Sequence, residues 1–112
     1  MQFLLMVLNK VEVLDTLLEE FMKIGVRGAT ILDSVGMARE LARCNEDYPL
    51  FGTLRFLIDL DRGESKTIFV VLRDEQVEIV KKVIRQVVGD LSKPDTAVIF
   101  TLPVLSAEGV EL

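Results

Sequence analysis

The chain has 112 residues and a net charge of −5, half of its residues are apolar, and its mean hydropathy is +0.39. This length and composition predict one folded domain over residues 1–112 rather than a disordered chain. The acidic balance, without a basic block, argues against binding to nucleic acid through phosphate neutralisation. The sequence contains no histidine, which argues against a zinc site and excludes Ser-His-Asp and Cys-His catalytic groups. We therefore expect a protein that is not an enzyme and holds no metal.

The sequence shows neither a membrane-spanning segment nor a signal peptide. No apolar run approaches the roughly 20 residues that cross a membrane. Met1–Leu8 is apolar but lacks the basic start of a signal peptide. The single cysteine, Cys44, forms no internal disulfide and is expected to be a structural thiol. These features predict a cytoplasmic protein that is not an integral membrane protein.

The first third of the chain predicts a strand, a helix and a second strand. Residues 3–8 are continuously apolar, as in a strand covered on one face and partly on the other. Asn9 is expected to cap the next helix, with Glu12 completing a capping box. The helix is predicted by apolar residues at positions i, i+3, i+4 and i+7, and it ends at Gly25. Residues 29–35 form the second predicted strand. The four apolar helix positions are Leu14, Leu17, Leu18 and Phe21.

The middle of the chain predicts an excursion followed by a hairpin. Residues 37–44 contain good helix formers and predict about two helical turns. Residues 45–52 are polar and rich in turn formers, so residues 36–52 are interpreted as an insertion that leaves the body of the domain. Residues 53–60 and 66–72 then predict the two arms of a β-hairpin.

The last third repeats the strand–helix–strand order. Asp74 is expected to cap a helix whose apolar band is wide, which predicts packing against something beyond its own sheet. A polar loop at 89–95 precedes a final strand at 97–102. Two such units give the order βαββαβ, which predicts an α+β ferredoxin-like sandwich with a short helical insertion. The apolar band comprises Val77, Ile79, Val80, Val83, Ile84 and Val87.

Two stretches of sequence carry a resemblance to a known family. The first is Gly28-Ala29-Thr30-Ile31-Leu32-Asp33-Ser34-Val35-Gly36-Met37-Ala38-Arg39-Glu40, and the second is Ile99-Phe100-Thr101-Leu102-Pro103-Val104 after the loop at 89–95. With the strand–helix order of the whole chain, they resemble the PII signal-transduction proteins (nitrogen regulatory protein P-II), and the Leu-Pro-Val ending looks more like the PII-like branch.

This resemblance implies a homotrimer whose three sheets pack inward, with an effector cleft between neighbouring subunits. The effector would be an adenine nucleotide or another small molecule, and the insertion at 36–52 would be the T-loop that relays the bound state to a partner protein, a transporter or an enzyme. The effector-binding residues that the resemblance implies are Thr30, Gly36, Met37, Ala38, Arg39, Glu40, Gly89, Asp90 and Lys93.

The chain also departs from the family pattern. Ala38 replaces a glycine and Glu40 a glutamine, which adds a negative charge where a triphosphate would lie. The family's paired arginines after the last strand are absent, because Ser106–Gly109 stands there. These departures favour a PII-like member with a different effector, or with none, over classical sensing of ATP and 2-oxoglutarate.

Plainer interpretations remain open for the individual residues. Arg39 fits a solvated helix arginine, Lys93 a surface turn, and Gly36 a strand end that needs an unusual backbone conformation. Asp59, Asp61 and Glu64 are explained by a hairpin turn, since the spacing of a calcium loop is missing. Tyr48 and Phe51 would either pin the insertion to the body or contact a partner.

Two other functions remain as alternatives. A ligand-free structural trimer similar to the CutA-like proteins would share the fold and the trimeric state. A small hydrolase of the acylphosphatase type would need an arginine-bearing anion loop after the first strand. The chain offers Asn9 there but only Lys10 as a cation.

Overall fold

The computed structural model describes residues 1–44 and 64–112. The predicted hairpin arm at 53–60, and the residues Tyr48, Phe51, Asp59 and Asp61, lie outside this part. In chain order the elements are β1 (Gln2–Leu8), the 3-10 turn η1 (Val11–Val13), α1 (Leu14–Lys23), β2 (Thr30–Ser34), α2 (Met37–Cys44), β3 (Ser65–Leu72), α4 (Asp74–Val88) and β4 (Ala97–Pro103).

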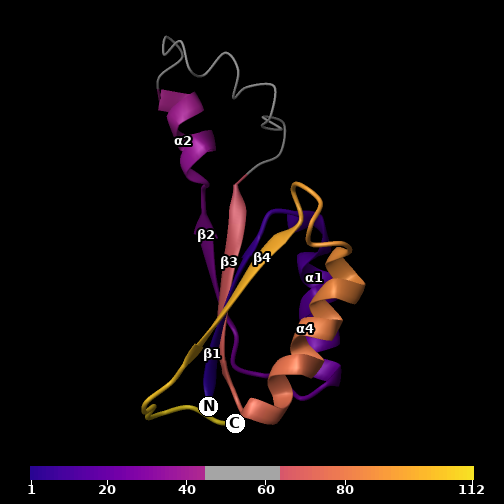
Figure 1. The fold of residues 1–112 in the computed structure, drawn as a ribbon, viewed down its shortest axis with the longest axis vertical. Helices are drawn as coiled ribbons and strands as arrows, with labels where there is room; N and C mark the ends of the chain where they lie inside the picture. Colours follow the sequence, from indigo (N-terminus) through magenta and orange to yellow (C-terminus); the bar gives the residue numbers. More distant parts are fainter. Residues whose placement is uncertain (45–63) are drawn as a thin grey trace.

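The four strands form one antiparallel sheet in the order β2-β3-β1-β4 (Figure 1). Helices α1 and α4 lie side by side on one face of this sheet, whereas α2 rises beyond its end. This is an α+β arrangement compatible with the predicted ferredoxin-like sandwich. β2 and β4 are the edge strands, which leaves one side of each without a partner within the described chain.

The core lies between the sheet and the two helices. Alternation along β1 and β3 points Leu4, Met6, Leu8, Ile68 and Val70 toward α1 and α4, where all five are buried. The helices contribute Leu17, Phe21, Val77, Val80, Val83, Ile84 and Val88.

The wide apolar band of α4 has a partner. The helix packs against α1 as well as against β1 and β3, which confirms that it contacts more than the sheet. Within this apolar band, the side chain of Ile79 is 53% exposed. The band is therefore explained by two neighbours within the chain, and it does not by itself require a second subunit.

The predicted helix starts are shifted. Asn9 does not begin the first helix, because its backbone N–H and that of Lys10 both donate to the carbonyl oxygen of Thr96, at 2.9 and 3.0 Å. The chain instead enters a 3-10 turn with Lys10 in the N-cap position. At α4 the cap is Arg73 rather than Asp74, and the Arg73 N–H donates to Oε1 of Gln76 at 2.9 Å.

The first helix ends at Gly25 as predicted. Gly25 has φ +88°, its N–H donates to the Met22 carbonyl at 3.1 Å, and the Val26 N–H returns to the Phe21 carbonyl at 2.9 Å. This backbone conformation favours glycine, because a Cβ approaches the carbonyl oxygen there.

We expect Gly25→Ala to lower the free energy of unfolding by about 1–2 kcal/mol, the cost of a left-handed conformation for an L-residue. The cause would be the backbone alone, since an added Cβ meets nothing within 4 Å. Gly28→Ala is the matched control: its Cβ also meets nothing, and its φ lies outside the left-handed region. Urea denaturation should show a lower free energy of unfolding for Gly25→Ala and an unchanged one for Gly28→Ala. Equal midpoints for the two variants would contradict a backbone requirement for glycine at position 25.

Candidate functional site

One half of the predicted site follows the edge strand β2. Gly36 leads into α2, whose first turn closes with the Glu40 N–H donating to the Gly36 carbonyl at 2.9 Å. Met37 is 79% exposed, and Ala38, Arg39 and Glu40 are half-buried. The helix Met37–Cys44 has the predicted bounds. The insertion thus begins with a helix that carries Arg39 and Glu40 away from the sheet (Figure 1).

The backbone of Gly36 corrects one expectation. Its φ lies outside the left-handed region, and an added Cβ would meet nothing within 4 Å. A strand end that needs an unusual conformation is therefore not the reason for this glycine. Thr30 does not belong to the same cluster either, since it lies at the opposite end of β2, paired with Phe69.

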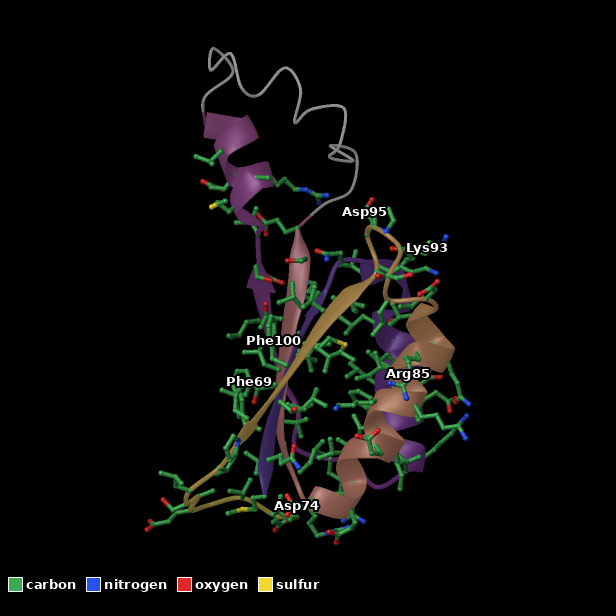
Figure 2. The ribbon with its side chains drawn as sticks, viewed as in Figure 1. Phe69, Asp74, Arg85, Lys93, Asp95 and Phe100 are labelled. Atoms are coloured by element: carbon green, nitrogen blue, oxygen red, sulfur yellow. The ribbon has the colours of Figure 1, made fainter. Side chains whose placement is uncertain are left out.

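The other half of the predicted site is the loop between α4 and β4. Gly89, at φ +103°, ends the helix. Asp90 Oδ1 then accepts hydrogen bonds from the Ser92 N–H at 2.9 Å and the Ser92 hydroxyl at 2.7 Å. The Lys93 N–H donates to the Asp90 carbonyl at 3.1 Å, and the side chain of Lys93 is exposed at the tip (Figure 2). The loop is a hydrogen-bonded turn that presents one cation.

The same hydrogen bonds fix the charge of the loop. Donation from the Ser92 hydroxyl and N–H lowers the pKa of the Asp90 carboxyl below its ordinary value. A lowered pKa means that the turn is favoured above the ordinary aspartate pKa of about 3.9 and loses this contribution as the pH falls further. At neutral pH the loop therefore carries a carboxylate beside Lys93, and an anionic ligand would meet both.

The two halves lie at the same end of the sheet but at opposite edges. Segment 36–40 follows β2 and the loop at 89–95 precedes β4, with β3 and β1 between them (Figure 1). Three strand spacings amount to about 14 Å. A single chain therefore does not bring Arg39 and Lys93 together around one small ligand.

Sequence reasoning missed a hollow elsewhere on the β2 side. It has a volume of about 540 Å³ and lies between the segment that follows α1, the end of β3 and the start of α4. Arg27, Arg73 and Gln76 line it, and none of the predicted effector residues does. Arg27 precedes β2 and Arg73 directly follows β3. Nothing in the sequence indicates that these two arginines lie beside the same hollow.

The open sheet face is the other feature that the sequence only hinted at. Residues that pair directly across antiparallel strands share a face, so the pairings of Phe3 with Val71 and of Leu5 with Phe69 place all four away from the helices. Phe69 and Phe100 point to this side in Figure 2. We define the open sheet face by Phe3, Leu5, Val7, Leu32, Phe69, Val71, Val98, Phe100 and Leu102.

This face is apolar and still exposed. Leu32, Val98, Phe100 and Leu102 are 47–52% exposed, and the rings of Phe3 and Phe69 stack at 5.5 Å. Where β2 meets β3 the face ends in hydroxyls, since Ser34 Oγ lies 2.8 Å from Ser65 Oγ and accepts from Thr67 Oγ1 at 2.8 Å. Exposed apolar patches of this kind mark interaction surfaces.

Across residues 1–44 and 64–112, no three His, Cys, Asp or Glu side chains gather in a way that could hold a metal ion. Over the same ranges no helix is long and apolar enough to span a membrane.

Comparison with protein-family models finds no match, and comparison with curated proteins finds none either. Among solved structures, the chain is similar to the crystal structure of a functionally unknown protein from Pediococcus pentosaceus. The TM-score is 0.62 at 16% sequence identity, and the match covers 96% of this chain and 94% of the other. At this identity the likeness shows the fold alone.

Proposed function

We propose that this protein is a homotrimeric PII-like regulator that binds a small effector between subunits and acts on a partner protein through the segment at 36–52. The open sheet face carries this proposal. Nine apolar side chains cover the side of the sheet that α1 and α4 leave free. Packing three such faces inward would bury them, which is the assembly that the PII resemblance implies.

The split of the predicted site supports the same proposal. Segment 36–40 forms the start of a helix and the loop at 89–95 forms a hydrogen-bonded turn. The two segments lie at opposite edges of one sheet. In a ring of copies, the β2 edge of one chain faces the β4 edge of the next. The effector would then lie between Arg39 of one subunit and Lys93 of its neighbour.

The charges at these positions define the effector. Arg39 and Lys93 would bind an anionic group, whereas Glu40 and Asp90 oppose one, so a triphosphate is less suitable than a ligand with less charge. The hollow beside Arg27 and Arg73 lies at the opposite end of β2 and also has Glu111 in its lining, so it adds no charge to this site. We therefore expect an adenine nucleotide or a related phosphate ester, in mono- or cyclic form. The regulated partner would be a transporter or an enzyme.

We expect a thermal-shift screen against ATP, ADP, AMP and cyclic mono- and dinucleotides, with and without Mg²⁺, to reveal the effector. A ligand at about 100 times its Kd stabilises by about 2.7 kcal/mol, which is easily visible. Arg39→Ala or Lys93→Ala should remove the shift, because each deletes one charged contact. Lys82→Ala, an exposed lysine on α4 away from both segments, is the matched control and should keep it.

The result that would defeat effector binding is the absence of a shift with every nucleotide. A trimer without any shift would favour the ligand-free, CutA-like structural trimer, because the open sheet face supports that alternative equally well.

A further inference from the structure

We infer that the hollow beside Arg27 and Arg73 is a second ligand site, which lies within one chain and binds a small organic anion with a carboxylate or phosphate group on an apolar body. The inference goes beyond the proposed effector site, because the hollow lies at the other end of β2 and is lined by residues of a single chain. Its volume of about 540 Å³ is in the range of sites that bind small molecules.

The hollow opens where β2 begins. The pairing of β2 with β3 starts at Thr30, opposite Phe69, and residues 25–28 before it run along the hollow. In the part of the chain that the structure describes, residues 70–72 of β3 pair with β1 alone. On their other side, backbone N–H and C=O groups of this stretch border the hollow. Backbone groups without a strand partner can hydrogen-bond to a ligand.

Two arginines from different elements line the hollow. Arg27 comes from the segment before β2, and Arg73 is the N-cap residue of α4. Arg73 Nε donates to Glu75 Oε1 at 3.0 Å, which leaves its two Nη groups for a ligand. Within residues 1–44 and 64–112, the Arg27 guanidinium makes no hydrogen bond or ion pair. Because a guanidinium binds a carboxylate or a phosphate through two parallel hydrogen bonds, these arginines favour an anionic group.

The rest of the lining suits the anion and its apolar body. α4 begins beside the hollow, so the positive end of its dipole adds to the two cations. Gln76 Oε1 accepts from the Arg73 N–H at 2.9 Å, and the amide nitrogen of Gln76 remains as a further donor. Val26, Val70 and Leu72, each at most 4% exposed, supply an apolar wall.

One carboxylate side chain also lines the hollow. Glu111, in the segment after β4, reaches it where the C-terminal residues lie beside the start of α4 (Figure 1). This carboxylate competes with an anionic ligand for the two arginines. Removing its charge while keeping its shape should therefore strengthen the binding of the anion.

Titration of the isotope-labelled full chain, followed by nuclear magnetic resonance, tests this site with matched probes. Benzoate and phenyl phosphate carry different anionic groups on the same ring, and benzyl alcohol carries no charge. At least one of the two anions should shift the amide signals of residues 25–28 and 70–76, which surround the hollow. Benzyl alcohol should leave them unchanged, and the anion that binds more tightly identifies the preferred group.

Substitutions in the lining assign the contacts. Arg27→Gln should weaken the binding of the anion about tenfold, because it removes charged hydrogen bonds. Gln76→Glu keeps the acceptor for the Arg73 N–H but adds a negative charge, and it should also weaken binding. Glu111→Gln should strengthen it. Arg85→Gln is the matched control, since Arg85 lies on the same helix but outside the hollow, and it should leave the affinity unchanged.

Two results would overturn this site. The first is the absence of amide shifts around the hollow with both anions. The second is an affinity that stays the same in Arg27→Gln and Gln76→Glu. Phe100→Asp, which places a charge on the open sheet face away from the hollow, should bind the anion with unchanged affinity whether or not the chains assemble. A failed trimer and a failed anion site are therefore distinguishable.

Discussion

Phe100→Asp is expected to convert the proposed trimer into folded single chains. Phe100 lies on the edge strand β4 within the open sheet face, opposite Leu5 on β1, and is 52% exposed in the single chain. In the separated chain the new carboxylate remains in water and the fold is retained. In the assembly three carboxylates would be buried against apolar side chains, at several kcal/mol for each ion. Light scattering should show the mass fall to that of one 12.6 kDa chain.

The control for this variant is Ile79→Asp. Ile79 is 53% exposed on α4, so the same substitution is made at nearly the same exposure but on the helix side of the molecule. It should leave the mass unchanged, and both variants should keep the circular dichroism of the parent. If both variants dissociate, or if neither does, the open sheet face is not the surface that joins the subunits.

The second large effect is expected in the core. Phe21 on α1 is 2% exposed and packs in the cluster between the sheet and α4. Phe21→Ala removes a ring and leaves a cavity, which should lower the free energy of unfolding by about 3–5 kcal/mol. Since small domains are stable by only about 5–15 kcal/mol, much of the stability would be lost.

The neighbouring Met22 provides the control, because it is 63% exposed on the same helix. Met22→Ala should shift the urea midpoint little. Both variants are compared at one protein concentration, since assembly contributes to apparent stability. A Phe21→Ala midpoint close to that of Met22→Ala would contradict the assigned core.

The spacing of the apolar residues along the sequence predicted much of this fold. The stripe at Leu14, Leu17, Leu18 and Phe21 located α1, and good helix formers located α2 with its observed bounds. These signals are local, so they can be interpreted from a short window of residues. The helix starts were less predictable, because the bonds from Asn9 and Lys10 to Thr96 join residues that are far apart in the sequence.

The candidate site was harder to predict for the same reason. The segments at 36–40 and 89–95 could be named from their residues, but their separation by two strands depends on the strand order of the whole sheet. Arg27 and Arg73 converge on a hollow only because the segment before β2 runs beside the end of β3. The continuous apolar run at residues 3–8 did indicate a strand with a second apolar face, and Phe3 and Leu5 now lie on the open sheet face.

The mass of the unmodified protein in solution decides whether the open sheet face joins three subunits. Light scattering or sedimentation equilibrium at micromolar concentration should give three times the 12.6 kDa chain mass. A mass of one chain over the whole concentration range would mean that the open sheet face stays in water, and it would contradict the trimer and every effector contact that depends on a neighbouring subunit.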